Sequence, residues 1–472
     1  MKGYSRRLLK MSIGRYYRCV LKLNQQDDLF VMDSKRPRYC DELSISVGIW
    51  FLAFMVFVLL MPMGAQADSG PSGLSLDDAV DKALGYHPLL KAKESEVSAA
   101  ESDLAAAKWG AYPQMSLSTQ TVFNDENTRV FNVSQPIWAG GQISGNIDLA
   151  SAVFSETEAG LSVEIKSIVL STSQAFFEVL LSGEKLKIAE NNMQEHSKLV
   201  KIIQRRFRAK TSPEVDVMLA SARLAQAEAQ VAQMEVAQEI AWTQLSQLIG
   251  FRPRSLVYPQ AEAALSVLGD FALKDLKAMA LDYSPDIKAL SANVEKSRAS
   301  VRVAKSIALP KINLGYEKRY GNLRFGQEQE QLFLGIDFQP GAGLSSRRQL
   351  SAAKLRVDSS RSNLQALSLE TNQTVEILYQ QHFSSKSQIE TTRVLVEAMS
   401  EVVASYLRQY TVGRKTWLDV LNSQRELFQA KNSLVDFRSQ NLNTGYKLLA
   451  ESGILQSNYL VKGSSGDRKS ND

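Results

Sequence analysis

Two long stretches of the chain, 145–208 and 345–410, have apolar residues at helical spacing and contain no proline. At about 1.5 Å per residue, each predicts a helix on the order of 95 Å long. Helices of this length are stable only when they lie against other helices. Each is followed by a second helical pattern, at 213–249 and 416–451, so the sequence predicts two long helical hairpins.

Four short segments show the period-two alternation of a β-strand instead, around 115–119, 131–133, 312–316 and 332–338. Apolar residues alternate with polar ones there, so each strand is expected to be apolar on one face only. The segments NDENT and GNLRFGQEQ between the strands of each pair are polar and predict hairpin connections. Shorter helical patterns precede each strand pair, at 75–85 and 88–109 and again at 272–283 and 285–308.

The second half of this pattern repeats the first. Matching prolines are 197 positions apart, and matching aspartates and glycines further along are 203 positions apart. Offsets that stay this close over such a distance predict a tandem duplication of about 200 residues, with one insertion near the middle of the second copy. The matched residues are Pro88 with Pro285, Pro113 with Pro310, Gly140 with Gly343, Asp216 with Asp419, and Gly250 with Gly453. We therefore expect repeats at 68–260 and 261–456, with a disordered C-terminal tail at 457–472.

The N-terminal segment 1–67 has the pattern of a leader. An uncharged apolar run, 47–63, is preceded by basic residues and followed by Ala65-Gln66-Ala67. This pattern predicts a signal peptide cleaved after Ala67. Because the leader is unusually long, we expect translation to start at Met32, with Met11 as the alternative start. The alternative is a transmembrane anchor, because seventeen residues is near the lower limit for a membrane span.

The leader accounts for the positive net charge of the sequence. It holds ten of the 55 basic and five of the 50 acidic residues, so 45 of each remain. The remainder is formally neutral, which gives no indication of nucleic-acid binding. Cys19 and Cys40 also lie in the leader, so the predicted mature chain has no disulfide and no cysteine that could carry a lipid.

Four strands cannot close a membrane barrel by themselves, because closed barrels have about eight strands or more. If the strands span a membrane, several chains must share one barrel, and three copies would supply twelve strands. The alternative is a small soluble sheet beside a helical stalk. The hydrophobic pattern leaves both open.

The whole arrangement resembles the TolC family of outer-membrane channel proteins, over roughly residues 74–455. The segments NVSQPIWAGGQISGNI (132–147) and YTVGRKTWLDVL (410–421) are similar to the strand-to-helix corner and the second helix tip of that family. The resemblance implies an α+β membrane fold: a homotrimer whose twelve-stranded β-barrel, with four strands per chain, continues into a twelve-helix periplasmic tunnel. It also implies passive export across the outer membrane of a Gram-negative bacterium, in contact with outer-membrane lipid. A periplasmic adaptor would connect the channel to an inner-membrane ABC or proton-driven pump.

The resemblance also implies roles for individual residues. At the periplasmic aperture it places Tyr410, Lys415, Asp419, Asn422 and Asp216. At the adaptor-docking tips it places Val412, Gly413, Arg414, Lys210, Thr211 and Ser212, and at the strand-to-helix corners Pro136, Trp138, Gly140, Gly141 and Pro340. Asn422 stands where some relatives have a second aspartate, so we expect weaker block by divalent cations than two acidic rings would give. The alternative interpretation of Asp216 and Asp419 is helix capping, and Thr416-x-x-Asp419 has the form of a capping box.

The sequence shows no catalytic or metal-binding pattern. His87, His196 and His382 are far apart and have no metal-ligand spacing, so no enzyme activity, metal or cofactor is expected. The missing lipid-attachment cysteine favours type I protein secretion over drug or metal efflux. A soluble periplasmic coiled-coil protein is the alternative from another functional class.

Overall fold

The computed structural model describes residues 73–120, 128–258, 265–321, 328–339 and 341–455, all of which belong to one compact unit, Gly70–Asp472. The predicted leader 1–67, the predicted tail 457–472 and Pro340 of the second corner lie outside the described residues, as does most of each hairpin connection.

The first half begins with two helices that meet at His87. Ser75 caps the first by accepting a hydrogen bond from Asp78 N, and Pro88 begins the second, where a missing N–H costs nothing. A pair of strands and a long helical hairpin follow. The elements are α3 (Leu76–Tyr86), α4 (Pro88–Trp109), β1 (Gln114–Gln120), β2 (Thr128–Trp138), α5 (Gln142–Arg208) and α6 (Glu214–Ile249).

The second half has the same order of helices and strands, with two additional 3-10 turns. Its elements are η1 (Val267–Asp270), α8 (Leu273–Tyr283), α9 (Pro285–Ile307), β3 (Lys311–Tyr320), β4 (Glu330–Asp337), η2 (Ala342–Leu344), α10 (Ser345–Thr411) and α11 (Trp417–Glu451). The predicted helices and strands are confirmed, with most boundaries shifted by a few residues.

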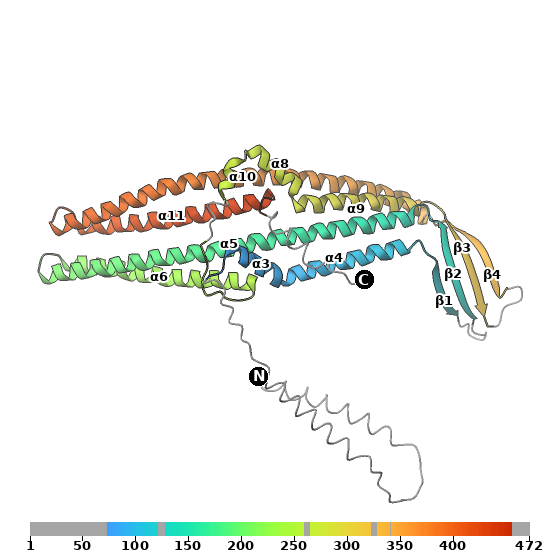
Figure 1. Cartoon of the computed structure of the whole chain (residues 1–472), viewed down its shortest axis with the longest axis horizontal. Coiled ribbons are helices and arrows are strands. Elements are labelled where there is room, and N and C mark those ends of the chain that lie inside the picture. The colour runs from blue at the N-terminus through green and yellow to red at the C-terminus, as the bar shows by residue number, and fades with distance from the viewer. Residues whose placement is uncertain (1–72, 121–127, 259–264, 322–327, 340, 456–472) are drawn as a thin grey trace, which may run out of the picture. The chain divides into compact units, whose positions relative to one another are not determined.

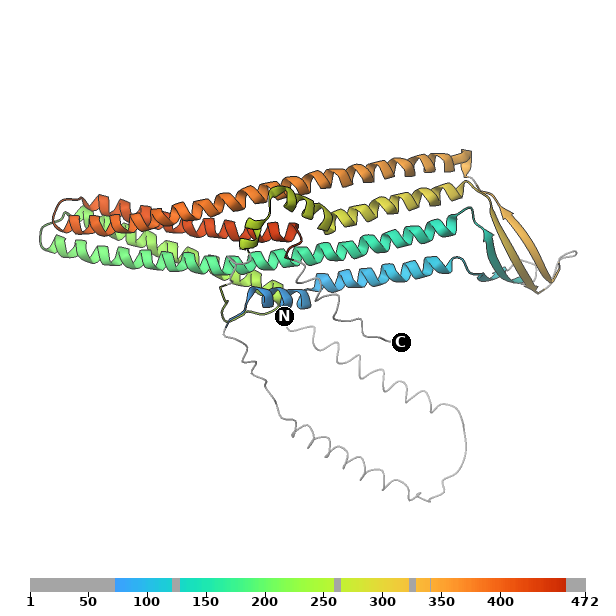
Figure 2. The ribbon, with the colours of Figure 1, turned by 45° about the horizontal axis from the view of Figure 1, so that its top comes forward.

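The long helices connect the strands to two turns, which we call the helix tips: 209–213 between α5 and α6, and 412–416 between α10 and α11. The sheet lies at one end of the helices and the two helix tips lie together at the other (Figures 1 and 2). In the part of the chain that the structure describes, none of the helices combines the length and the apolar character needed to cross a bilayer.

The four strands form one antiparallel sheet in the order β1-β2-β3-β4, so the two halves join where β2 pairs with β3. Met115, Val133, Tyr316 and Leu332 are register partners and share one face. This face is mostly apolar and open: Met115, Leu117, Leu332 and Ile336 are each more than 70% exposed. The prediction of strands that are apolar on one face is confirmed, and β1 and β4 are the edges of the described sheet.

The main core lies midway along the long helices, where the short helices α3 and α8 pack against them (Figure 1). Phe176 and Phe177 of α5 are completely buried, and the ring of Phe177 lies 4.8 Å from that of Tyr446 in α11. This contact joins the two halves at a distance from both the sheet and the helix tips.

Each hairpin ends on a glycine that packs against a tyrosine of its own half. Gly250 has φ 85° and Gly453 has φ 77°, a conformation that favours glycine. A Cβ on Gly250 would lie 2.7 Å from the ring of Tyr86, and one on Gly453 would overlap the ring of Tyr283. Both contacts therefore require glycine, which explains why the two glycines recur at matching positions.

Candidate functional site at the helix tips

The two helix tips have the same backbone geometry although their sequences differ. Gly413 has φ 77°, and Lys210, exactly one repeat earlier, has φ 59°. In both turns two amides close back on the preceding helix: Lys210 N on Phe207 O and Thr211 N on Arg206 O, then Gly413 N on Tyr410 O and Arg414 N on Gln409 O, at 2.9–3.1 Å. The first tip therefore forms the same turn without a glycine.

A small apolar cluster holds the two tips together. Tyr410 and Trp417 are 6% and 4% exposed, and their ring centroids lie 5.4 Å apart. They pack with residues from both hairpins, namely Leu199, Val200, Ile203, Ala220, Val420 and Leu421. The cluster is separate from the main core.

Polar contacts to Tyr410 reinforce this cluster. The Tyr410 hydroxyl lies 3.4 Å from Ser212 Oγ of the first tip. The Arg206 guanidinium lies 4.7 Å from the centre of the Tyr410 ring, and Arg206 Nη1 donates to Thr411 O at 3.5 Å. Arg206 and Trp417 were not among the predicted site residues. Their position within one turn of each tip is the sequence signal that could have identified them.

The Asp419 carboxylate caps the first turn of α11. Its Oδ2 accepts hydrogen bonds from Thr416 N at 3.0 Å and from Thr416 Oγ1 at 2.8 Å, and Asp419 N donates to Thr416 Oγ1 at 3.2 Å. The capping interpretation is therefore confirmed for Asp419, whereas α6 begins after Pro213 without a side-chain cap. These bonds from Thr416, together with the nearby Lys415 charge, lower the pKa of Asp419 and keep it ionised at neutral pH.

The other predicted aperture residues are placed differently. Lys415 Nζ lies 4.2 Å from the ring centre of Tyr406, on its own hairpin. Asp216 is half-buried in the first turn of α6, where its charge favours the helix dipole. Asn422 is half-buried and lines a groove between the hairpins. The structure thus brings Tyr410 and Ser212 together but does not join Asp216 to Asp419.

The residues predicted to dock an adaptor are mostly at the surface. Val412 is 70% exposed, and Gly413, Arg414, Lys210 and Thr211 are also exposed, whereas Ser212 is half-buried against Tyr410. An exposed valine at the end of a helical hairpin offers an apolar contact that no described residue covers.

The first strand-to-helix corner is built from a bulge and two glycines. The pairing of β2 with β3 shifts between Pro136 and Trp138, and Gly140 and Gly141 follow with φ 59° and 83°. A Cβ on Gly140 would lie 2.8 Å from Leu309 Cβ, so this position requires glycine on two grounds. At the second corner Gly343 has φ 60°, which is the left-handed backbone conformation of Gly140.

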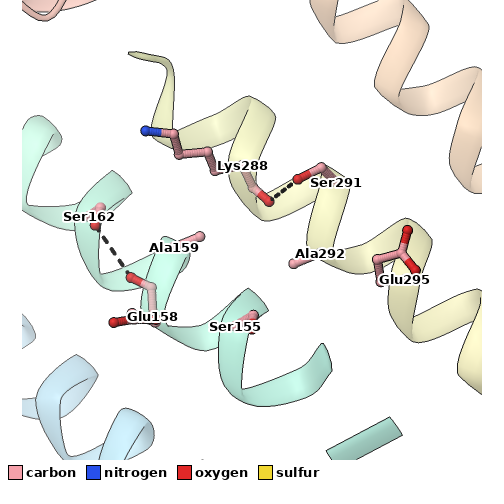
Figure 3. A pocket seen from close by; sticks show the side chains of 8 residues that line it. All are labelled: Ser155, Glu158, Ala159, Ser162, Lys288, Ser291, Ala292 and Glu295. Atoms are coloured by element: carbon pink, nitrogen blue, oxygen red, sulfur yellow. Dashed lines mark hydrogen bonds between the residues drawn. The ribbon is translucent and has the colours of Figure 1, made fainter. Parts of the chain in front are cut away.

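A wide groove of about 520 Å³ lies between α5 and α9, and Figure 3 shows its lining. Two of its serines donate hydrogen bonds to backbone carbonyls of their own helices: Ser291 Oγ to Lys288 O at 2.8 Å, and Ser162 Oγ to Glu158 O at 3.4 Å. Lys288 Nζ lies over the ring of Tyr283 instead. The described residues contain no group of three or more His, Cys, Asp or Glu side chains that could hold a metal ion.

The outer membrane efflux protein model matches residues 79–251 and 276–452, which is more than half of the chain and covers both repeats. The chain belongs to the outer membrane efflux protein family. Proteins of this family are outer-membrane channels and not enzymes, so this efflux protein is a channel component located in the outer membrane. The predicted likeness to the TolC family is confirmed, and a soluble coiled-coil protein is set aside.

The names of two curated relatives, AprF and CzcC, specify different substrates. This efflux protein is 24% identical to the alkaline protease secretion protein AprF of Pseudomonas aeruginosa, over 61% of this chain and 62% of AprF. Protein CyaE of Bordetella pertussis is 23% identical over 81% of this chain and 84% of CyaE. The cobalt-zinc-cadmium resistance protein CzcC of Cupriavidus metallidurans is 22% identical over 79% of this chain and 88% of CzcC. The match to AprF thus spans less than two thirds of its length.

The crystal structure of the channel CusC has the same fold. It superposes with a TM-score of 0.69 at 17% identity, over 80% of this chain and 91% of CusC. Because the identity is low, this similarity establishes the fold and nothing about the exported substrate.

Proposed function

We propose that three copies of this efflux protein form one channel, with a shared twelve-stranded barrel in the outer membrane and a helical tunnel in the periplasm. The observation that carries this proposal is the four-stranded sheet, which has two edge strands and an exposed apolar face. A bilayer does not tolerate open strand edges, and four strands are too few to close a barrel. Three copies would pair every edge and turn the apolar faces towards lipid.

The helix tips are the proposed contact with a periplasmic adaptor, through which an inner-membrane pump would supply substrate. Val412, Arg414 and Lys210 support this role because they are exposed. The position of the tips also supports it, since they lie at the end of the helices farthest from the strands (Figure 2). In this arrangement the domain division at 68–260 and 261–456 gives each repeat one tip.

The periplasmic aperture is the proposed site of gating. Three ionised Asp419 side chains around one axis would concentrate negative potential, and the Tyr410–Ser212 contact would hold the two tips of each chain together. Asn422 is uncharged, so this position adds no second ring of negative charge to the aperture.

Type I protein secretion is the proposed export route. It is supported by the relative AprF, whose name specifies secretion of an alkaline protease. Metal efflux is the second candidate, because CzcC is named for cobalt-zinc-cadmium resistance and its match spans 88% of its length.

Two measurements test these proposals. Membrane fractionation should recover a heat-sensitive trimer in outer membranes, and a soluble monomer would refute the shared barrel. Deletion of the gene in the native host should remove a large protein from the culture medium without changing metal sensitivity. Greater sensitivity to zinc or cobalt with unchanged secretion would favour the second candidate.

A further inference from the structure

A small polar groove lies between the first hairpin and α11, where the two hairpins of the chain pack against each other. Its polar lining comes from three helices: Asn192 and His196 of α5, Arg223 and Gln226 of α6, and Asn422 and Arg425 of α11. The cavity has a volume of about 50 Å³, which is room for a few water molecules or one small ion.

The charged groups in this lining are both arginines, and none of the lining residues is a carboxylate. Arg223 Nη1 donates to Gln226 Oε1 at 2.9 Å. Within the described residues, neither Arg223 nor Arg425 forms an ion pair with a carboxylate. Two cationic side chains from different hairpins therefore line one cavity whose lining contains no carboxylate.

The floor of the groove contains an unsatisfied buried group. His196 is 7% exposed, and its Nδ1 has no hydrogen-bond partner among the described residues. A buried polar atom of this kind normally has a partner, and His196 is one of the residues that line the cavity. Asn192 Oδ1 accepts from Gln424 Nε2 at 3.3 Å, so Asn192 has its amide N–H groups to offer to a ligand.

We propose that this groove binds a small oxyanion, of the size of phosphate, sulfate or a carboxylate, between Arg223 and Arg425. Guanidinium groups and amide N–H groups are the donors that recognise oxyanions. A bound anion would bridge α6 of the first hairpin to α11 of the second. The anion would therefore hold the two hairpins together near the helix tips. This inference does not depend on the number of chains in the channel or on its substrate.

The test uses the full-length protein in detergent, with sodium phosphate replacing sodium chloride at constant ionic strength. The unfolding temperature of the wild-type protein should rise by about 2 °C or more beyond the rise of the groove variants. Arg223→Gln and Arg425→Gln should each lose this additional rise. Arg393→Gln is the matched control, because Arg393 pairs with Glu390 on the surface of α10 and should keep it. Phosphate also stabilises proteins by exclusion, an effect that all four proteins share, so the difference between them is the readout.

Equilibrium dialysis against radiolabelled phosphate provides a second measurement that does not depend on stability. Wild-type protein and Arg393→Gln should each bind one phosphate per chain, and the two groove variants should bind none. Equal thermal shifts in all four proteins, or dialysis without bound phosphate in the wild type, would overturn the proposal.

Discussion

Lys210 has a positive φ at the first helix tip, where the second tip has Gly413. For a residue with a side chain this conformation costs about 1–2 kcal/mol. Glycine avoids that cost, but its greater freedom in the unfolded chain lowers the stability of the folded state by about 0.5–1 kcal/mol. We therefore expect Lys210→Gly to stabilise the tip by about 0.5–1 kcal/mol. Amide hydrogen exchange checks this, because Thr211 N, which closes the turn on Arg206 O, should exchange several-fold more slowly.

The matched control is Gly413→Ala, which places a side chain on the same φ in the second repeat. It should destabilise the second tip by a comparable amount and speed exchange at Arg414 N. A Cβ added at Gly413 would meet no other atom within 4 Å, so a change in exchange there reports backbone strain and not a steric clash. Faster exchange in Lys210→Gly would show that the lysine side chain stabilises its own turn.

Residues near the tips differ in how well their roles can be predicted from the sequence. The Asp419 cap follows from a local pattern, Thr416-x-x-Asp419, and the structure confirms it. The left-handed Lys210 has no local signature, because only its match to Gly413 across the duplication indicates it. The stacking of Arg206 on Tyr410 depends on how the hairpins pack, which no local pattern specifies.

At the scale of whole helices, a buried lysine connects α5 to two helices of the second half. Lys166 Nζ lies 2.8 Å from Glu451 Oε2 in α11 and 3.1 Å from Asp286 Oδ2 in α9. Burial of Lys166 opposes its charge, but Glu451 and Asp286 outweigh this and raise its pKa. Lys166→Ala would leave two partly buried carboxylates side by side, so we expect a loss of about 2–3 kcal/mol in unfolding free energy, measured by denaturant titration.

Lys185→Ala provides the comparison for this prediction. Lys185 also lies on α5 and pairs with α11 through Asp436, but both side chains are substantially exposed. Exposed ion pairs contribute about 0–1 kcal/mol, so this variant should remain close to the wild type. If the two substitutions had equal effects, burial would not be the reason for the importance of Lys166.

The elements themselves were predictable because their boundaries depend on local chemistry. Proline begins α4 and α9, glycine ends α6, and the period of two distinguishes the strands from the helices. The position of Lys166 in the interior was not predictable, because the matching residue of the second repeat, Leu369, is 65% exposed. The same helix position is therefore buried in one half and exposed in the other, and the packing between halves decides which.

At the scale of the whole chain, the duplication accounts for more of the fold than any single motif does. Two copies of one plan give two hairpins whose tips meet and two strand pairs that join at β2 and β3. Neither copy completes the sheet, and the two together still leave both edges open. This incompleteness is the physical reason why the function is proposed for an assembly and not for one chain.

The stability of the chain should also depend on pH through two buried histidines, one near the tips and one near the main core. His196 and His382 are 7% and 3% exposed. Burial lowers the pKa of both histidines, with smaller contributions in the same direction from Arg223 at His196 and Lys386 at His382. Glu195 at His196, and the hydrogen bond that the Asn441 carbonyl accepts from the His382 ring, raise the pKa. Both therefore stay neutral in the folded chain at pH values where the unfolded chain is already protonated.

As the pH falls below about 6.5, the unfolded chain takes up these protons first, so stability is complete above this pH and decreases towards the lower folded pKa values. Each histidine can contribute at most about 1.4 kcal/mol per pH unit to the slope. Denaturant titrations between pH 7.5 and 5.5 should show this decline in the wild type. The double variant His196→Gln/His382→Gln should show a flatter profile whatever its absolute stability, because the slope counts protons and not contacts. An unchanged slope would mean that the two imidazoles take up protons equally in the folded and unfolded chains, and that other groups set the pH dependence.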